Sequence, residues 1–587
     1  MNKKTILIIT GIVLIIIAII MLIFVFLNNP KPISKCGDGV CDAKEKQKNI
    51  CPQDCKSAVK GCKNENEFCG GIAGIKCCSG LTCEYDGDYP DAGGVCAKGG
   101  DAQKSCSKLG GNICSSSQTC SGSWLDVSDN GRCCDKECIT STIDYKDSPF
   151  GIMAVFDSTT LTNINTSDTK HWAGDHFSNL GAKWSRGAGE LITWVDMEPV
   201  LGQGYDWSRS DKALSDVFKN TEADFNYISW INPTRVPKGS RGSIDIDSSN
   251  EESFKNFVKA FVERYDGDGH YDYCDATNYN SACNPVIKVK YWQAEGEPFP
   301  HVWEDYGGTI DGYVRFVELL SQSAKEADPD AKIVLGACTV KTQEQADIFE
   351  SLISKMKNKN LFEYADTHYW EDDYNIPVSY MKDILNSNGY SDVKIVSLEY
   401  GTYTGRSSSE KDQAFYLIKG YVSNLANGLS LINWNNLVEW DNYGGNPKSI
   451  YNYMGLIADG LNEDIVPAGT PRLSYYTYKL MVEKLEGSDW DNIQTIQESD
   501  NVYIYKFTKN NEPVWVAWND DSTSKTISLD VGSINSVKIT EAVPDAESGA
   551  DLDENDYPDF FKTETKTASG GEVEVILGES PVFIEGE

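Results

Sequence analysis

The stretch Val286-Ile-Lys-Val-Lys-Tyr-Trp-Gln-Ala-Glu-Gly-Glu-Pro-Phe299 decides how the chain folds. It begins with alternating apolar and polar residues, which is the period of a β-strand. The strand must end near Pro298, because proline donates no ladder hydrogen bond and biases Glu297 toward an extended conformation. The stretch therefore predicts a carboxylate at the C-terminal end of a strand, where parallel barrels place their functional residues.

A second strand with a similar ending is predicted in Val393-Lys-Ile-Val-Ser-Leu-Glu-Tyr-Gly401, where apolar residues run into Glu399 and a glycine. Strands followed by helix-like segments are predicted at 150–156, 181–186, 224–230, 286–293, 332–338, 364–369, 393–399 and 430–435. Eight strand–helix repeats favour a closed (β/α)8 barrel, the TIM barrel. A doubly wound sheet is the alternative, but no glycine-rich phosphate loop follows the first strand.

The clearest helix of this region is predicted over 250–265. Its apolar residues at helical spacing are Phe254, Phe257, Val258, Phe261, Val262 and Tyr265. Ser249, followed three residues later by Glu252, predicts a capping box at its start.

Several predicted strands end in polar or aromatic residues where a purely structural barrel would carry aliphatic ones. They are Arg186, Trp230 with Asn232, Glu297, His368 with Tyr369, Glu399 and Trp434. One such residue is usually structural, but six strand ends on one rim predict a site at the barrel mouth. We expect Arg186 to hold a carboxylate ionised and Trp434 to offer an aromatic face to a ligand ring.

Length and charge limit the possible functions. A chain of 587 residues is too long for one core, and 40% hydrophobic residues are typical of globular proteins. The formal net charge of −35 argues against nucleic acid as a partner, since phosphates would be repelled. We interpret this charge as a solvated acidic surface.

An unbroken apolar run from Thr5 to Leu27 is long enough to cross a bilayer. Lys3 and Lys4 precede it, which favours a cytoplasmic N-terminus. A cleaved signal peptide is the alternative, but it would have a shorter apolar core and a small-residue cleavage site. We therefore expect residues 1–30 to be a membrane anchor.

Sixteen of the nineteen cysteines lie between Cys36 and Cys138. This region contains no histidine and no C-x₂-C pair, so disulfides outside the cell are favoured over metal binding. The spacing divides it into a four-cysteine module at 31–58 and two six-cysteine modules at 59–99 and 100–140. These modules either contact glycans or the cell wall or act as a protease-resistant spacer, and both interpretations stay open.

The remaining candidates concern metals and the C-terminal region. Residues 266–272 have the acidic spacing that begins a calcium loop, but an acidic turn is favoured, and no metal or cofactor is predicted. Cys274 and Cys283 are expected to pair, and Cys338 to be a buried small hydrophobe. Residues 488–587 change to short alternating strands, which predict an antiparallel β-sandwich after a barrel domain at 141–487.

Residues 148–487 resemble the retaining clan A glycoside hydrolases, with family 39 as the nearest type. Trp292-Gln-Ala-Glu-Gly-Glu-Pro298 is similar to the end of the family's fourth strand, and Ser397-Leu-Glu-Tyr-Gly401 to the end of its seventh. The resemblance implies an acid/base at Glu297, a nucleophile at Glu399, and carboxyl groups about 5–5.5 Å apart. It also implies roles for Arg186 and Trp434 in binding an oligo- or polysaccharide. The middle cysteine module resembles a knottin, which implies the pairs 62–78, 69–83 and 77–96.

One departure from the family pattern concerns Gly296, which stands where the family has an asparagine that contacts the sugar 2-hydroxyl. Losing one such donor costs a few kcal/mol of transition-state stabilisation. Glu295 is a second carboxylate that could project toward the mouth. Two further readings therefore stand beside a membrane-anchored extracellular glycosidase: a non-catalytic carbohydrate-binding protein with a degenerate barrel, and a structural envelope protein without a cleft.

Overall fold

The computed structural model of the chain describes short stretches of the cysteine-rich region and most of the chain after residue 147. The described residues are 68–70, 81–85, 93–98, 106, 112–113, 118–120, 124–125, 133–134, 136, 138–140, 148–153, 169–187, 193–219, 221, 225–235, 243–267, 272–273, 287–298, 308–357, 359–370, 373–405, 408–439, 449–460 and 466–587. The predicted anchor at 5–27, the module at 31–58, the Cys274–Cys283 pair and most of 266–272 lie outside them. No helix within the described ranges is long and apolar enough to cross a membrane.

The chain divides into two compact units, one of residues 1–114 and 120–138 and one of residues 115–119 and 139–587. In the first unit, β1 (Phe68–Gly70), β2 (Leu81–Tyr85) and β3 (Gly93–Lys98) form an antiparallel sheet with β3 in the middle. A second small sheet contains β4 (Asn112–Ile113), β6 (Trp124–Leu125) and β7 (Cys133–Cys134). Two further short strands, β5 (Gln118–Cys120) and β8 (Cys138–Thr140), pair with each other, and most of their residues belong to the second unit. Cys69 and Cys106 are each disulfide-bonded, and the pairing implied for the middle module stays a prediction.

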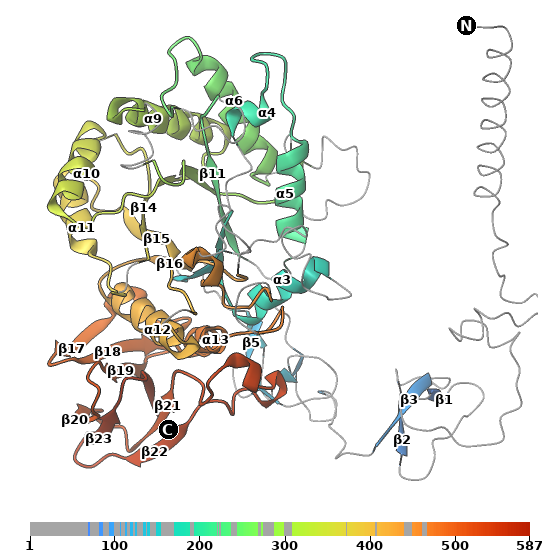
Figure 1. The fold of residues 1–587 in the computed structure, drawn as a ribbon, viewed down its shortest axis with the longest axis vertical. Coiled ribbons are helices and arrows are strands. Elements are labelled where there is room, and N and C mark those ends of the chain that lie inside the picture. Colours follow the sequence, from blue (N-terminus) through green and yellow to red (C-terminus); the bar gives the residue numbers. More distant parts are fainter. Residues whose placement is uncertain are drawn as a thin grey trace, which may run out of the picture. The chain divides into compact units, whose positions relative to one another are not determined.

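Eight parallel strands of the second unit close into a barrel (Figure 1). They are β9 (Phe150–Ile152), β10 (Trp184–Arg186), β11 (Asn226–Ile231), β12 (Tyr291–Ala294), β13 (Lys332–Leu335), β14 (Tyr364–Tyr369), β15 (Lys394–Tyr400) and β16 (Leu431–Trp434). Each strand pairs with its neighbour in chain order, and β16 pairs with β9 to complete the ring. All eight predicted strands are present, most of them shorter than predicted, and the barrel prediction is confirmed.

The barrel interior changes from apolar to polar along the strands. Alternate residues of a strand point inward, so Trp184 and Arg186 of β10 share the interior side. Trp184 packs in a cluster made only of strand residues, which also contains Tyr291 and is bordered by Tyr364. Two residues further along β12 and β14 come Gln293 and Asp366. A polar layer therefore lies above an aromatic one, toward the C-terminal ends of the strands.

Helices surround the strands in Figure 1. They are α3 (Thr169–Asn179), α4 (Trp194–Met197), α5 (Ser208–Lys219), α6 (Glu251–Tyr265), α9 (Ile310–Ala327), α10 (Gln343–Lys355), α11 (Val378–Ser387), α12 (Glu410–Ala426) and α13 (Leu473–Leu485). All six predicted apolar residues of α6 are buried. The predicted capping box is wrong: the N-cap is Asn250, and the Ser249 hydroxyl instead donates to the Asp247 carboxylate, at 2.5 Å.

The C-terminal region forms an antiparallel sheet domain, which confirms the predicted change of fold. Its six-stranded sheet has the order β17 (Gln494–Ser499), β18 (Val502–Lys509), β19 (Glu512–Asn519), β24 (Val582–Gly586), β21 (Ser536–Glu541), β22 (Thr563–Thr567). A two-stranded sheet of β20 (Lys525–Asp530) and β23 (Glu572–Leu577) shares a buried core with the larger sheet. Tyr505 and Trp518 of the larger sheet belong to the same continuous core as the barrel helices.

A buried ion cluster joins the barrel to the chain that follows it. The Arg472 guanidinium donates to Glu439 Oε1 (2.9 and 2.6 Å) and to Glu410 Oε1 (3.1 Å). Glu410 also accepts the backbone N–H groups of Leu473 and Gly549, at 3.0 and 2.8 Å. The charged side chains are between 1% and 8% exposed, so each depends on its partners for the interactions that water would otherwise supply.

We predict that Arg472→Met destabilises the barrel by about 3–5 kcal/mol, because two buried carboxylates lose their cation. The measurement is urea unfolding of the full chain, followed by tryptophan fluorescence. Arg315→Met is the matched control: Arg315 also pairs with two carboxylates but is 47% exposed, so about 0–1 kcal/mol is expected. Equal losses in the two variants would contradict the account.

Candidate active site

Four strand ends bring charged and amide side chains together at the C-terminal mouth of the barrel. Arg186 is the last residue of β10, Gln293 lies near the end of β12, and His368 lies near the end of β14. Glu399 is the penultimate residue of β15, and Glu297 lies three residues beyond the end of β12. The structure thus places both predicted catalytic glutamates on the same rim.

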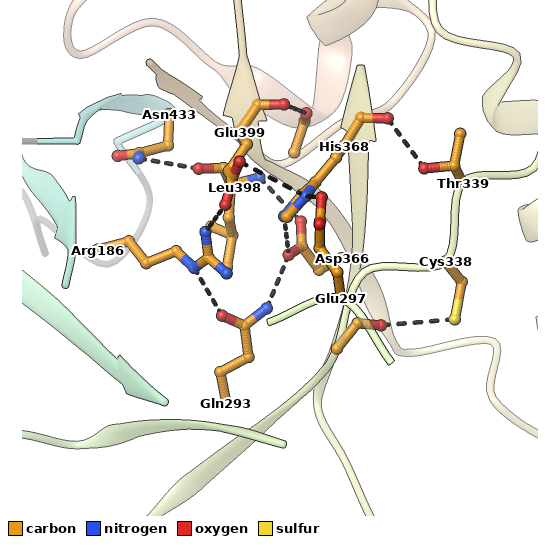
Figure 2. A network of polar contacts seen from close by, with 12 residues as sticks. Arg186, Gln293, Glu297, Cys338, Thr339, Asp366, His368, Leu398, Glu399 and Asn433 are labelled. Atoms are coloured by element: carbon orange, nitrogen blue, oxygen red, sulfur yellow. Dashed lines mark hydrogen bonds and ion pairs between the residues drawn. The ribbon is translucent and has the colours of Figure 1, made fainter. Parts of the chain in front are cut away.

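A continuous chain of polar contacts connects these residues (Figure 2). Arg186 Nη1 forms an ion pair with Glu399 Oε1, and Arg186 Nε donates to Gln293 Oε1 at 2.7 Å. Gln293 Nε2 in turn donates to Asp366 Oδ2 at 2.7 Å. Asp366 also contacts His368 Nε2 at 3.1 Å and accepts the Leu398 backbone N–H at 2.8 Å. Three donors therefore hold the fully buried Asp366 carboxylate in place.

His368 stands between the two glutamates. Its Nδ1 lies 2.6 Å from Glu297 Oε1 and 3.7 Å from Glu399 Oε2. Burial alone would lower the pKa of His368, but the negative charges of Glu399 and Asp366, with hydrogen bonds to Asp366 and Glu297, raise it to about 10. At neutral pH His368 is therefore an imidazolium that donates from both ring nitrogens.

Arg186 is a second buried cation, 1% exposed. Burial works to lower its pKa, but Glu399 and Asp366 raise the pKa above its usual value. Its guanidinium carbon also lies 4.6 Å from the centre of the Trp230 ring, which adds a cation–π contact. The predicted pairing of Arg186 with a carboxylate is thus present, and that carboxylate is Glu399.

Glu297, His368 and Glu399 are also the group of described residues that offers metal ligands, because one ligand atom from each lies within 4.8 Å of the others. The His368 Nδ1–Glu297 Oε1 separation of 2.6 Å is a hydrogen-bond distance that a proton fills. A metal would have to displace that proton and separate the two side chains. We therefore assign the group to proton chemistry.

Glu295 shapes the turn that presents Glu297. It has a positive φ of 62°, which is unusual for a residue with a side chain. Its carboxylate accepts the Glu297 backbone N–H at 2.7 Å and the Asn232 side-chain amide at 3.3 Å. Burial raises the pKa of Glu295, although the hydrogen bond from the Glu297 backbone N–H acts to lower it. Glu297, by contrast, is 54% exposed, so it is the carboxylate of this segment that a ligand can reach.

Gly296 is explained by close packing against Trp230. A Cβ at residue 296 would lie 1.6 Å from Trp230 Cζ3 and 2.9 Å from Arg186 Nη2. The indole ring therefore occupies the space into which a side chain at residue 296 would extend. Trp230 on the neighbouring strand therefore leaves no room for an asparagine side chain at residue 296.

Two predicted aromatic residues lie differently from what the sequence led us to expect. Trp434 is fully buried, and its indole N–H donates to the Met454 carbonyl at 3.0 Å, so it presents no face to a sugar. Tyr369 is also buried, and the Lys341 ammonium lies 4.7 Å from the centre of its ring.

Trp370 and Tyr451 are half-buried aromatic residues that sequence analysis missed. Their ring centres lie 5.6 Å apart, and Trp370 is 5.8 Å from the His368 ring. Burial raises the pKa of Tyr451, and the charges of Glu297 and Glu399 raise it further, so Tyr451 lies within electrostatic reach of both carboxylates.

Gln293 and Asp366 were missed as well. Strand alternation was the available signal, because each lies two residues before a polar residue that was identified, Glu295 and His368 respectively. Tyr451 carried no such signal, since it lies outside the eight strands, in a 3₁₀ turn (η4, Ile450–Tyr453).

Comparison with solved structures shows the same fold in glycoside hydrolases. A family 39 glycoside hydrolase from Bacteroides cellulosilyticus WH2 is similar over 79% of this chain and 89% of its own, with a TM-score of 0.52 and 13% identity. A monomeric beta-xylosidase from Caulobacter crescentus CB15 gives a TM-score of 0.48 at 12% identity over 75% of this chain and 96% of its own, too low to support an argument. No protein-family model and no curated protein matches the sequence. At these identities, what the chain shares with the Bacteroides enzyme is the fold.

We predict that Asp366→Asn lowers the pKa of His368 from about 10 by roughly 1–3 pH units, because a neighbouring negative charge is removed. NMR titration of the imidazole carbons measures this, with His368→Gln used to assign the resonance. His176 is the internal control: burial lowers its pKa to about 4, and the substitution should not change it.

The same shift links stability to pH. The pKa of His368 is raised above 6.5, so its stabilisation is complete below pH 6.5 and is lost as pH rises through about 10. His368→Gln should remove the loss of stability between pH 6.5 and about 10.

For the Asp366→Asn variant, a pKa of His368 that stays unchanged would contradict the assigned network.

We predict that Gly296→Asn destabilises the protein by about 1–3 kcal/mol, because the new side chain overlaps the Trp230 ring. Trp230→Ala should make room for it, so the same substitution should cost less in the Trp230→Ala background. Urea unfolding of the four proteins of this double-mutant cycle gives the coupling free energy. Additive effects would show that the two residues do not share this space.

Proposed function

We propose that the protein is a retaining glycoside hydrolase in which Glu297 is the acid/base and Glu399 the nucleophile. One observation carries the proposal: an oxygen of Glu297 and an oxygen of Glu399 lie within 4.8 Å of each other at the barrel mouth. Retaining enzymes hold their carboxyl groups about 5–5.5 Å apart, whereas inverting enzymes leave roughly 6.5–9.5 Å for a water molecule. The separation supports direct attack by a carboxylate.

The charges of the site suit the first chemical step. Arg186 and His368 carry two positive charges, and Asp366, Glu399 and Glu297 would carry three negative ones if all were ionised. One added proton brings the sum of these charges to zero, and we place it on Glu297, whose 54% exposed carboxyl a leaving oxygen can reach. Glu399 then attacks the anomeric carbon while Glu297 protonates the leaving oxygen, which forms a glycosyl–enzyme ester and releases the aglycone.

The second step returns the enzyme to its starting state. Glu297, now ionised and hydrogen-bonded to His368, takes a proton from water, and the hydroxyl attacks the anomeric carbon. The bond to Glu399 breaks, and Arg186 and His368 stabilise the carboxylate that leaves. Both cations are held before reaction, so little reorganisation is needed.

The substrate class and location are also proposals. The net charge of −35 favours neutral β-linked glycans over polyanionic ones, and Trp370 with Tyr451 supplies an aromatic surface beside the carboxylates. The apolar run 5–27 would anchor the protein in the cell membrane, with the barrel outside. The cysteine-rich modules would then form a disulfide-stapled stalk, with either the spacer or the glycan-contact role left open.

A non-catalytic carbohydrate-binding barrel is the second candidate. Gly296 favours it, because the space for a side chain that would contact the sugar is filled by Trp230. In that case the carboxylates would bind sugar hydroxyls without cleaving the glycosidic bond.

We predict that Glu399→Gln lowers kcat on an aryl β-glycoside by several orders of magnitude, because the amide cannot form the glycosyl ester. Glu297→Gln should cost roughly 10²–10⁴-fold on poor leaving groups and less on activated ones, since general acid catalysis contributes about that much. Initial rates over a panel of nitrophenyl glycosides measure both effects.

Glu574→Gln on β23 is the control, because this exposed glutamate belongs to the C-terminal sheet domain and not to the barrel. Activity that survives Glu399→Gln overturns the nucleophile assignment. A wild-type protein that binds the glycosides and never cleaves them supports the binding-protein candidate instead.

A further inference from the structure

A second concave site lies at the opposite end of the barrel from the carboxylates. It is a pocket of about 560 Å³, which is within the range of small-molecule sites. Pro149, Lys394 and Ser430 line it, and they stand at or just before the N-terminal ends of β9, β15 and β16. Along β15, Lys394 and Glu399 are five residues apart, which corresponds to about 16 Å at roughly 3.3 Å per residue.

The other wall of the pocket is the segment that leads from the barrel into the C-terminal sheet domain. Ser488, Asp489, Trp490 and Asp491 all line it. Pockets form preferentially at such junctions between domains. Trp490 is held by T-shaped contacts with Phe150 of β9, at 5.5 Å, and with Phe507 of β18, at 6.2 Å. Its ring is thus fixed by both domains and does not depend on a flexible loop.

The lining groups match a neutral ligand rich in hydroxyl groups. Lys382 and Lys394 balance Asp489 and Asp491, so the pocket has no net charge to attract an anion or a cation. Ammonium groups donate hydrogen bonds and carboxylates accept them, and a sugar hydroxyl can do both. Ser488 is 7% exposed, and its hydroxyl has no hydrogen-bond partner within the described chain.

Lys382 is positioned for this role by local backbone structure. Its ammonium donates to the Asn427 carbonyl at 2.7 Å. A Cβ on Gly428 would lie 2.1 Å from the same nitrogen, and Gly428 has a φ of +93°. A glycine at this turn leaves the space that the lysine head occupies at the pocket wall.

We infer that this pocket is a second carbohydrate-binding site. It takes a short neutral saccharide between Trp490 on one side and the side chains of Lys382 and Asp491 on the other. This second site goes beyond the proposed function. The inference rests on the proposed function only for the choice of saccharides as probes. A chain held at this site stays tethered to the enzyme, which raises the effective concentration of the rest of the polymer.

The test uses the full chain carrying Glu399→Gln, so that no probe is hydrolysed. Xylohexaose, cellohexaose and mannohexaose are titrated by isothermal calorimetry, with inorganic phosphate as the anionic probe. We expect two saccharide sites per chain. Asp491→Ala and Lys382→Ala should each weaken one of the two sites by about tenfold or more, the effect of losing a hydrogen bond to a charged group. Asp383→Ala, an exposed acid on the same helix as Lys382 that does not line the pocket, should leave both sites unchanged.

Three results would overturn the inference: one site only that neither pocket variant alters, no saturable binding of any hexasaccharide, or phosphate that displaces the saccharide from this site. Failure of the proposed function is recognised separately. If turnover survives Glu399→Gln while Asp491→Ala still removes one saccharide site, the catalytic assignment falls and the second site stands.

Discussion

The buried guanidinium of Arg186 is the constraint on which the barrel mouth depends. A cation that is 1% exposed must be compensated by partners inside the protein, and it is paired with Glu399 and hydrogen-bonded to Gln293. Removing one partner of such a pair leaves an uncompensated charge, which typically costs about 3–5 kcal/mol. The ion pair therefore holds the Glu399 side chain in one place before any ligand arrives.

The same requirement extends through the rest of the polar layer. Gln293 satisfies Arg186 with its oxygen and Asp366 with its nitrogen, so the amide transmits the orientation of one charged group to the other. Asp366 in turn fixes His368, and His368 holds Glu297 at 2.6 Å. The aromatic layer below excludes water from one side of this network, which strengthens each of its interactions. A second buried ion cluster around Arg472 applies the same principle where α12 and α13 meet the sheet domain.

The barrel strands and the two glutamates could be predicted because their signals are local. Period-two alternation, the Glu297-Pro298 break and the glycine after Tyr400 can be read without knowledge of the fold. Strand alternation places Asp366 on the same side of its strand as His368, but only the closed barrel shows that this side is the interior. The burial of Trp434 depends on Met454, 20 residues away and beyond the strand.

Local rules also failed where two local interactions compete. Ser249 has the residue type and spacing of an N-cap, but Asp247 accepts its hydroxyl and its backbone N–H, and the helix begins after Asn250. Gly296 is a similar case across strands. The reason for a glycine at residue 296 could not be predicted from its own segment, because the Trp230 ring that fills the space comes from β11.

The stereochemistry of the first product tests the central claim most directly. Proton NMR recorded in the first minutes of aryl β-glycoside hydrolysis distinguishes the two anomers before they interconvert. Attack by Glu399 followed by attack of water inverts the anomeric carbon twice, so the β-anomer should form first. Initial formation of the α-anomer would mean that water attacks directly, and the assignment of Glu297 and Glu399 as an acid/base–nucleophile pair would be wrong.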